Sequence, residues 1–194
     1  ANLLTQSGRP TTEGAVVRVA IDNHWAVTDP TLPSWRRGGS NADGQHNLLS
    51  SFGIRNDILA GYNENGVANL LRSGRGVIIA VDAGVLWESP QYESEQVDHA
   101  VTLTGAVYRE SDGALLGFYI TDSGRQMVSD MTRFVPIELF RAAARVTGAY
   151  AIYTIEPLKL WDENINGTGN AGNNQIIGNR GDNILAGLAG NDTL

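Results

Sequence analysis

His99 and Asp122 are the two residues whose types and positions could support catalysis. His99 stands at the start of an apolar stretch, and Asp122 directly follows another, LLGFYIT. The Asp112-Gly113 pair between these stretches is typical of a tight β-hairpin turn, which brings the start of one strand opposite the end of the next. An aspartate beside a histidine accepts the second ring N–H, fixes the tautomer and stabilises the imidazolium. We therefore predict a His99–Asp122 pair, which is half of a nucleophile–His–Asp constellation.

Structural interpretations of the histidines and of Asp122 stay open. Asp122 begins Asp-Ser-Gly, a common turn sequence, and His99 could be a structural residue of a buried strand. His24 is expected to be a packing or capping group at a helix end, and His46 a surface residue. The chain has no Cys, and its available hydroxyl groups do not follow a glycine-rich turn at a helix N-terminus, where the helix dipole would activate them. These hydroxyls, which we do not assign as nucleophiles, belong to Ser7, Ser123 and Thr104.

The C-terminal segment repeats with a period of nine residues. The copies are GNAGNNQII from Gly169, GNRGDNILA from Gly178 and GLAGNDTL from Gly187, with Gly at positions one and four and Asn or Asp at positions five and six. This pattern resembles the glycine-rich nonapeptide (RTX) repeat, which implies calcium as the ligand and the start of a parallel β-roll. Calcium prefers carboxylate and carbonyl oxygens. The expected metal ligands are therefore Asn174, Asp182, Asn183 and Asp192.

The apolar positions of the repeats are expected to point inward as the turns stack. These positions are Ile176 and Ile184 (or Leu185). Turns on one side recur every second repeat, so the first and third copies face one another with oxygen ligands between them. Asn at position six of the first two copies supplies no charge, so these turns should bind calcium weakly. The alternatives are an Asn-rich linker and a calcium-free cap of a solenoid.

Composition excludes several classes of protein. The 194 residues include 14 Lys and Arg against 21 Asp and Glu, a net charge of -7. Nucleic-acid grooves and proteins of anionic membrane surfaces need a basic stripe instead. No apolar run approaches the ~20 residues that span a bilayer, and the lack of Cys excludes disulfide scaffolds and zinc–thiolate sites. We therefore expect neither a nucleic-acid partner nor a transmembrane segment.

The elements that must position the pair are a set of helices followed by a sheet. Apolar residues at helical spacing predict the helices, and Pro136 is expected at the first position of the last one. Apolar runs bounded by turn residues predict the strands. Helices followed by a largely antiparallel sheet make an α+β domain. The predicted helices are 1–7, 12–25, 43–52, 64–73 and 136–146, the strands are 76–83, 100–108, 115–121 and 149–155, and 26–42 is a loop.

Part of the chain resembles a known peptidase family. The stretches GRGVIIAVDAGVLW and DHAVTLTGAVYRESDGALLGFYITDSG are similar to the C-terminal half of papain-like cysteine peptidases related to the bacteriocin leader-processing (double-glycine) peptidases. In that family a Cys opens the first long helix, a Gln just before it completes the oxyanion hole, and a His and an Asp follow on adjacent strands. His99 matches the family's His-Ala/Val motif and Asp122 its strand-end Asp. The family's Cys and Gln would then precede Ala1.

The resemblances together imply an exported enzyme. Residues 1–158 would be a papain-like domain, 159–168 a linker and 169–194 the calcium-binding repeats. The implied function is a secreted cysteine peptidase of the Cys-His-Asp type, with a peptide or protein substrate, exported by type I secretion machinery. A peptidase and a transferase are not distinguished. The alternatives are a non-catalytic extracellular binding protein or adhesin that uses a degenerate peptidase-like domain, and a calcium-binding structural protein whose globular part is a spacer.

Overall fold

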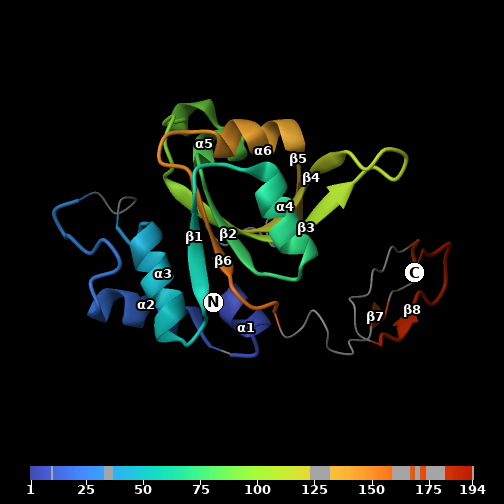
Figure 1. Ribbon diagram of the computed structural model, residues 1–194, viewed down its shortest axis with the longest axis horizontal. Coiled ribbons are helices and arrows are strands. Elements are labelled where there is room, and N and C mark those ends of the chain that lie inside the picture. Colours follow the sequence, from blue (N-terminus) through green and yellow to red (C-terminus); the bar gives the residue numbers. More distant parts are fainter. Residues whose placement is uncertain are drawn as a thin grey trace.

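A six-stranded antiparallel sheet forms the centre of the globular part (Figure 1). The computed structural model describes residues 1–9, 11–32, 37–122, 132–158, 167–168, 171–173 and 182–193. Neighbouring strands of the sheet pair antiparallel throughout. In spatial order the strands are β1 (Asn56–Ala60), β6 (Tyr150–Thr154), β2 (Val77–Val81), β3 (His99–Tyr108), β4 (Leu115–Thr121) and β5 (Arg133–Pro136).

Helices cover both faces of this sheet, which confirms the α+β prediction (Figure 1). One group is α4 (Glu64–Arg72), α5 (Ala83–Leu86) and α6 (Ile137–Ala144), with the 3-10 turn η2 (Pro90–Tyr92) after α5. The other group is α1 (Asn2–Gln6), α2 (Glu13–Asp22) and α3 (Ala42–Ser51). None of the helices that the structure describes is long and apolar enough to cross a membrane.

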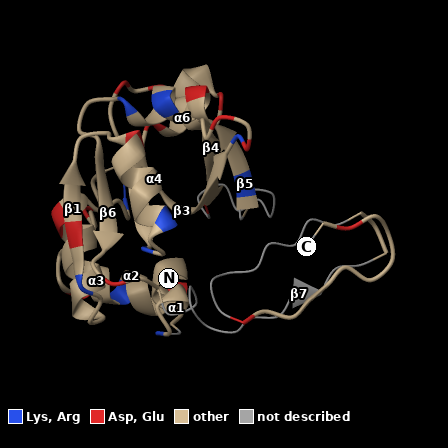
Figure 2. Cartoon of the chain, turned by 45° about the vertical axis from the view of Figure 1, so that its right-hand side comes forward, with Lys and Arg blue, Asp and Glu red and all other residues tan. Residues whose placement is uncertain are grey.

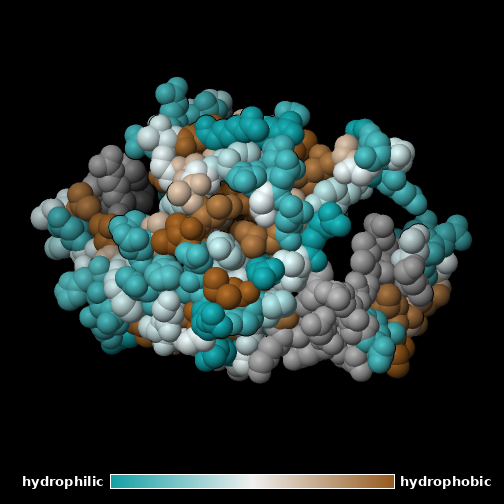
Figure 3. Space-filling model, in the orientation of Figure 1, coloured by the Kyte–Doolittle hydropathy of each residue, from teal (hydrophilic) through white to brown (hydrophobic). Residues whose placement is uncertain are grey.

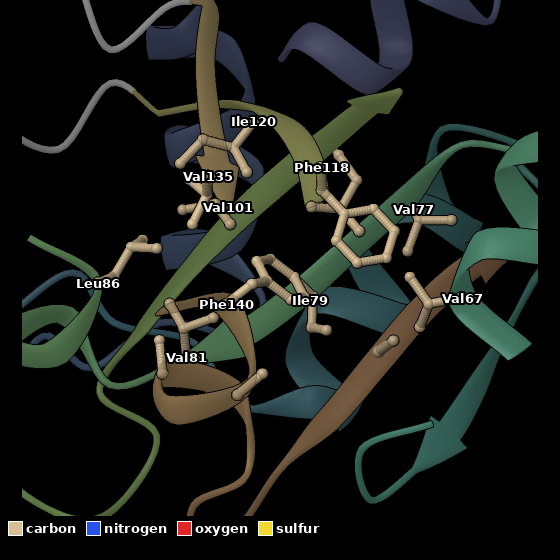
Figure 4. Close-up of a cluster of buried hydrophobic side chains, with 14 of the residues drawn as sticks. Val67, Val77, Ile79, Val81, Leu86, Val101, Phe118, Ile120, Val135 and Phe140 are labelled. Carbon is tan, nitrogen blue, oxygen red and sulfur yellow. The ribbon is translucent and has the colours of Figure 1, made fainter. Parts of the chain in front are cut away.

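The larger hydrophobic core lies between the sheet and the α4–α6 group (Figure 4). Phe118 of β4 and Phe140 of α6 are fully buried, with ring centroids 4.6 Å apart. Burying a side chain of this size contributes about 1.5–3 kcal/mol. A second core, on the other face of the sheet, joins Leu3 and Leu4 of α1 to Leu49 of α3 and Ile152 of β6. Each face of the sheet is therefore fixed by its own set of side chains.

The hairpin predicted at Asp112-Gly113 is present and joins β3 to β4. Gly113 has φ +70°, and the Arg109 N–H donates to the Ala114 carbonyl at 2.8 Å. Thr102 pairs with Thr121, so Asp122 follows at the level of Val101, two residues from His99. Alternate residues of a strand share a face. The hairpin register therefore places His99 and Asp122 within reach of one another.

Several predicted elements differ from the observed ones. The predicted helix 136–146 covers Ile137–Ala144, and Pro136 is its N-cap rather than its first residue because it also ends β5. Two edge strands, β1 and β5, and the short helix α5 were not predicted. The edge strands have four or five residues and no regular alternation, so periodicity could not reveal them. The predicted strand 76–83 ends at Val81, because Asp82 caps α5 by accepting the Val85 N–H at 3.2 Å.

Candidate functional site

His99 and Asp122 form a hydrogen-bonded pair at the ends of β3 and β4. His99 Nε2 lies 2.8 Å from Asp122 Oδ2, and the two side chains are 26% and 3% exposed. An ionised carboxylate only accepts hydrogen bonds, so Nε2 carries the proton and Nδ1 presents its lone pair. Nδ1 makes no hydrogen bond to any residue that the structure describes. The arrangement is therefore an oriented imidazole whose basic nitrogen is available to take a proton.

The backbone around His99 is held by β2 and by the loop between β2 and β3. His99 pairs with Val81, and the Asp98 N–H donates to the Val81 carbonyl at 3.1 Å. The Asp98 carboxylate accepts the Ala83 N–H at 2.9 Å and the Ser94 hydroxyl at 3.2 Å. These contacts fix the residue directly before His99, and with it the direction in which the imidazole leaves the strand.

The buried carboxylate of Asp82 accepts hydrogen bonds from several backbone N–H groups of this loop. Its side chain is fully buried, and Oδ2 accepts the N–H groups of Ser94 and Glu95, each at 2.8 Å. Oδ1 accepts the N–H of Val85. Burial acts to raise the pKa of Asp82, but the hydrogen bonds from these backbone N–H groups outweigh it, so the pKa lies below its ordinary value. Asp82 therefore stays ionised and organises the loop that leads to His99.

An open groove of about 800 Å³ runs beside His99. One wall is formed by the start of β3 and the residues just before it, including Val97 and His99. The other wall is the connection between α2 and α3, including His24, Trp25 and Gly39. Backbone hydrogen bonds between Val27 and residues 38 and 39 hold the second wall together. The volume is within the range of ligand-binding clefts. A chain segment lying in this groove would pass the partly exposed imidazole.

A second cavity, of about 320 Å³, lies on the Asp122 side of the pair. Ala1 and Asn2 line it together with Thr121 and Asp122, so the N-terminal end of α1 faces the strand end that carries the aspartate. Gln45 of α3 lines both this cavity and the groove. Ala100, directly after His99, also lines both, so the two cavities flank the strand that carries the histidine.

Basic and acidic residues are interspersed along the chain. Figure 2 shows Lys and Arg positions interspersed with Asp and Glu positions over the described elements in that view. Figure 3 shows hydrophobic residues gathered near the middle of the visible face, between hydrophilic ones.

The structure distinguishes between the interpretations of the other histidines. His24 ends α2 with φ +59°, which confirms the capping interpretation, and it is exposed and lines the groove, so the packing interpretation is wrong. His46, expected on the surface, is only partly exposed, and its Nδ1 lies 2.8 Å from Asn56 Oδ1. Nothing in the sequence indicated that His24 lines the groove, because the two walls of the groove come from segments that are distant along the chain.

Of the three hydroxyl groups considered in the sequence, the two that the structure describes do not lie next to His99 as nucleophiles. Ser7 donates its hydroxyl to the Leu3 carbonyl at 2.8 Å, so it is engaged within α1. Thr104 is exposed on β3, five residues beyond His99, and does not line the groove. Ser123 lies outside the described residues.

Contacts in the C-terminal tail recur at a separation of 18 residues, twice the repeat period. β7 (Gly167–Thr168) pairs in parallel with β8 (Leu185–Ala186), Gly167 facing Leu185. The Asn191 N–H donates to Asn173 Oδ1 at 2.9 Å, again 18 residues apart. A Cβ at Gly190 would lie 2.6 Å from the Gly172 carbonyl oxygen. The Asn173–Asn191 and Gly172–Gly190 contacts therefore join copies one and three at equivalent positions, whereas β7–β8 joins the two residues before copy one to the end of copy two.

The expected calcium ligands are oxygen donors, which suits calcium. Asp182 is exposed, Asn183 and Asp192 are half-buried, and Asn174 lies outside the described residues. The Asp192 carboxylate lies over Gly187, where a Cβ would be 2.2 Å from its Oδ2. Among the described residues no three His, Cys, Asp or Glu side chains gather into a metal-binding group. Of the residues expected to point inward, Ile176 lies outside the described residues; in the second copy Ile184 is wrong, because it is 71% exposed, whereas its alternative Leu185 is half-buried.

Comparison with known proteins identifies the tail. A family model described as an RTX calcium-binding nonapeptide repeat (4 copies) matches residues 167–194. Repeats of this kind bind calcium and are typical of secreted proteins, so the tail is a calcium-binding segment. No curated protein and no solved structure matches the chain.

Proposed function

We propose that this chain belongs to a secreted, papain-like cysteine peptidase of the Cys-His-Asp type with a calcium-binding β-roll tail. The observation that carries the proposal is the 2.8 Å contact between His99 Nε2 and Asp122 Oδ2 at the side of an open groove. The nearly buried Asp122 orients the ring, and the ring keeps one nitrogen without a partner among the described residues. A peptide or protein substrate would lie in the groove.

The chemistry follows from the free ring nitrogen. His99 Nδ1 would accept the proton of a thiol, and the thiolate would attack the carbonyl carbon of the substrate peptide. Asp122 would stabilise the imidazolium that results. His99 would then return the proton to the leaving amine, and a water molecule would hydrolyse the thioester, with His99 again acting as the base.

The nucleophile is proposed on the segment that precedes Ala1. The N-terminal end of α1 lines the same cavity as Asp122, and Leu3 and Leu4 are buried in the second core, which fixes the direction of the helix. A chain continuing backwards from Ala1 would start from this cavity.

The tail is proposed to continue as a parallel β-roll. The parallel pairing of β7 with β8 and the Asn173–Asn191 hydrogen bond both have the 18-residue offset that a two-repeat turn requires. Asn174, Asp182, Asn183 and Asp192 would contribute calcium ligands, and the calcium would link stacked turns. Export by type I secretion machinery fits a tail that folds where calcium is abundant, because binding then drives folding.

Labelling of the full-length protein by a peptidyl vinyl sulfone tests the peptidase proposal. This reagent must lie in the groove and be attacked by a thiol. His99→Ala removes the general base, so the labelling rate should fall by about 100-fold or more. Asp122→Asn keeps the shape and removes the charge that stabilises the imidazolium, so the rate should fall as well.

His46→Ala is the matched control. His46 also has a 2.8 Å side-chain contact, but to Asn56 and outside the groove, so its replacement should leave the labelling rate unchanged. Equal labelling of the wild type and His99→Ala would refute the assignment. Absence of labelling in a wild type that still binds the peptide would favour the non-catalytic binding protein.

A bulky side chain introduced into the groove provides a second test of the peptidase proposal. Gly39 lines the groove, its φ is not in the left-handed region, and an added Cβ would meet nothing within 4 Å. Gly39→Trp should therefore fill the groove at little cost to folding and lower the rate of labelling. Gly14→Trp introduces the same side chain at an equally open position outside the groove and should not change that rate.

A further inference from the structure

We infer that His24 is a substrate-contact residue of the groove, donating a hydrogen bond from its imidazole to an oxygen of the bound peptide. This inference rests on the proposed function, because it assigns a residue to the groove beside His99.

His24 occupies a position at which glycine is the usual residue. The Trp25 N–H donates to the Ala20 carbonyl at 2.8 Å and the His24 N–H to the Ile21 carbonyl at 3.0 Å. These two bonds form the Schellman motif that ends α2, with His24 at the left-handed position, φ +59°. A side chain in this region of φ and ψ is uncommon, although His is tolerated better than most residues. The backbone alone would favour Gly here.

Among the described residues, the imidazole has no hydrogen-bond partner that would compensate for this backbone conformation. His24 is exposed, and its ring makes no hydrogen bond to any residue that the structure describes. Its neighbour is fixed, because the Ser40 hydroxyl donates to the Trp25 carbonyl at 2.6 Å and ties the end of α2 to the start of α3. The ring is therefore presented from a rigid backbone while remaining available for a ligand.

His24 differs in location from the other described non-glycine residues that have a positive φ. The described non-glycine residues with positive φ are His24, Glu88, Glu95 and Leu188. Of these four, only His24 lines the groove that contains His99. Unfavourable backbone conformations that persist tend to occur at functional sites. The two histidines stand on opposite walls, so a peptide between them would contact both.

The chemistry of an imidazole defines what it can hold in a peptide. A ring N–H is a hydrogen-bond donor, and the acceptors that every peptide offers are its carbonyl oxygens, with carboxylates at acidic residues. A contact on the wall opposite His99 would hold the substrate without taking part in bond breaking. His24 would then affect binding of the peptide rather than the reaction rate once it is bound.

The test compares His24→Gly with Glu88→Gly in the full-length protein with calcium. Glu88 ends α5 with the same motif: the Ser89 N–H donates to the Gly84 carbonyl at 2.7 Å, and φ is +53°. It does not line the groove. Neither variant should lower the melting temperature, and His24→Gly should raise it by up to about 4 °C. Labelling by the peptidyl vinyl sulfone and thermal unfolding are measured for both.

His24→Gly should raise KI of the vinyl sulfone by about 5- to 10-fold, the range of one hydrogen bond to a ligand, with the maximal rate kept. His24→Asn, which tolerates the backbone and retains a donor, should recover part of the affinity. Glu88→Gly should behave as the wild type. An unchanged KI in His24→Gly, or a lower melting temperature that indicates a structural role, would overturn the inference while leaving the peptidase proposal intact.

If the wild type is not labelled at all, the peptidase proposal fails and a binding measurement decides the inference. The same peptide without its vinyl sulfone, carrying a fluorophore, is titrated with protein and followed by anisotropy. Weaker binding to His24→Gly than to the wild type and Glu88→Gly supports the contact. Equal binding by all three, or no binding by the wild type, overturns it.

Discussion

Replacing Asp82 by Asn should destabilise the globular part far more than a single surface charge would. The carboxylate is fully buried and accepts three backbone N–H groups, those of Ser94, Glu95 and Val85. Asn keeps one oxygen, so at least one of these N–H groups would face an NH₂ donor, and the remaining bonds would lose their charge. Hydrogen bonds to charged groups contribute about 1.5–3 kcal/mol, and an unsatisfied buried donor costs about 1–3 kcal/mol.

The free energy of unfolding should therefore fall by about 3 kcal/mol, which for a domain of this size lowers the melting temperature by about 6–12 °C. Differential scanning calorimetry at neutral pH measures this. Ser94→Ala is the control, because it keeps the backbone N–H that Asp82 accepts and removes only the hydroxyl, which lies 3.4 Å from Asp82 Oδ2, 3.2 Å from Asp98 Oδ2 and 3.0 Å from the Gln96 carbonyl oxygen. It should cost less than about 1 kcal/mol. Comparable losses in both variants would contradict the role given to the carboxylate.

The pH dependence of this difference has a definite sign. The pKa of Asp82 in the folded protein lies below its ordinary value, so the folded state binds this proton less readily than the unfolded state. The stability that ionised Asp82 contributes is present above the unfolded pKa and is lost as the pH falls through the lower, folded pKa. Wild type and Asp82→Asn should therefore differ most at neutral pH and converge in strong acid. A gap that is constant from neutral pH to pH 3 or below would refute the reasoning.

Three further changes are predicted from packing. Gly76→Ala should destabilise the domain by about 1–3 kcal/mol in chemical denaturation, because the new Cβ would lie 2.0 Å from Leu3 Cδ1. Phe140→Ala, at a fully buried position, should cost about 3–5 kcal/mol in the same measurement. Gly190→Ala should lower the calcium-induced β content of the tail in circular dichroism, because its φ is +120° and a Cβ would meet the Gly172 carbonyl.

Each of these packing predictions has an outcome that contradicts it. Gly14→Ala, at an open helical position, should be neutral or stabilising, so a loss equal to that of Gly76→Ala would indicate a general effect of losing glycine. A loss below 1 kcal/mol for Phe140→Ala would mean that the core collapses around the gap. An unchanged calcium response in Gly190→Ala would show that the turns do not stack through this glycine.

The sequence located the His99–Asp122 contact because a local signal was sufficient. A tight turn at Asp112-Gly113 determines which residues of the two flanking strands lie opposite one another, and both candidates belong to those strands. The nine-residue period likewise specified a contact between copies one and three, which the Asn173–Asn191 hydrogen bond shows. Both inferences depend on regular geometry that repeats along the chain.

The features that the sequence did not reveal depend on segments that are distant along the chain. The groove is formed by the α2–α3 connection and by residues near His99, and no periodicity links them. His46 looked exposed from its own helix, but Asn56, ten residues later, covers its Nδ1. β1 pairs with β6, nearly a hundred residues away. Contacts of this kind are decided by tertiary packing, which overrides local preference.

The described parts of the two groove walls are held by different kinds of contact. His99 belongs to a strand that is paired on both sides, by β2 and β4. On the other wall, two backbone hydrogen bonds join Val27 to residues 38 and 39, and the Ser40 hydroxyl donates to the Trp25 carbonyl. Strands within a sheet open locally at the highest free energy, because their backbone bonds break together. His99 is therefore fixed by the sheet, whereas His24 is fixed by the tie between the end of α2 and the start of α3. If the groove holds a peptide, as proposed, each histidine would meet it from an anchored backbone.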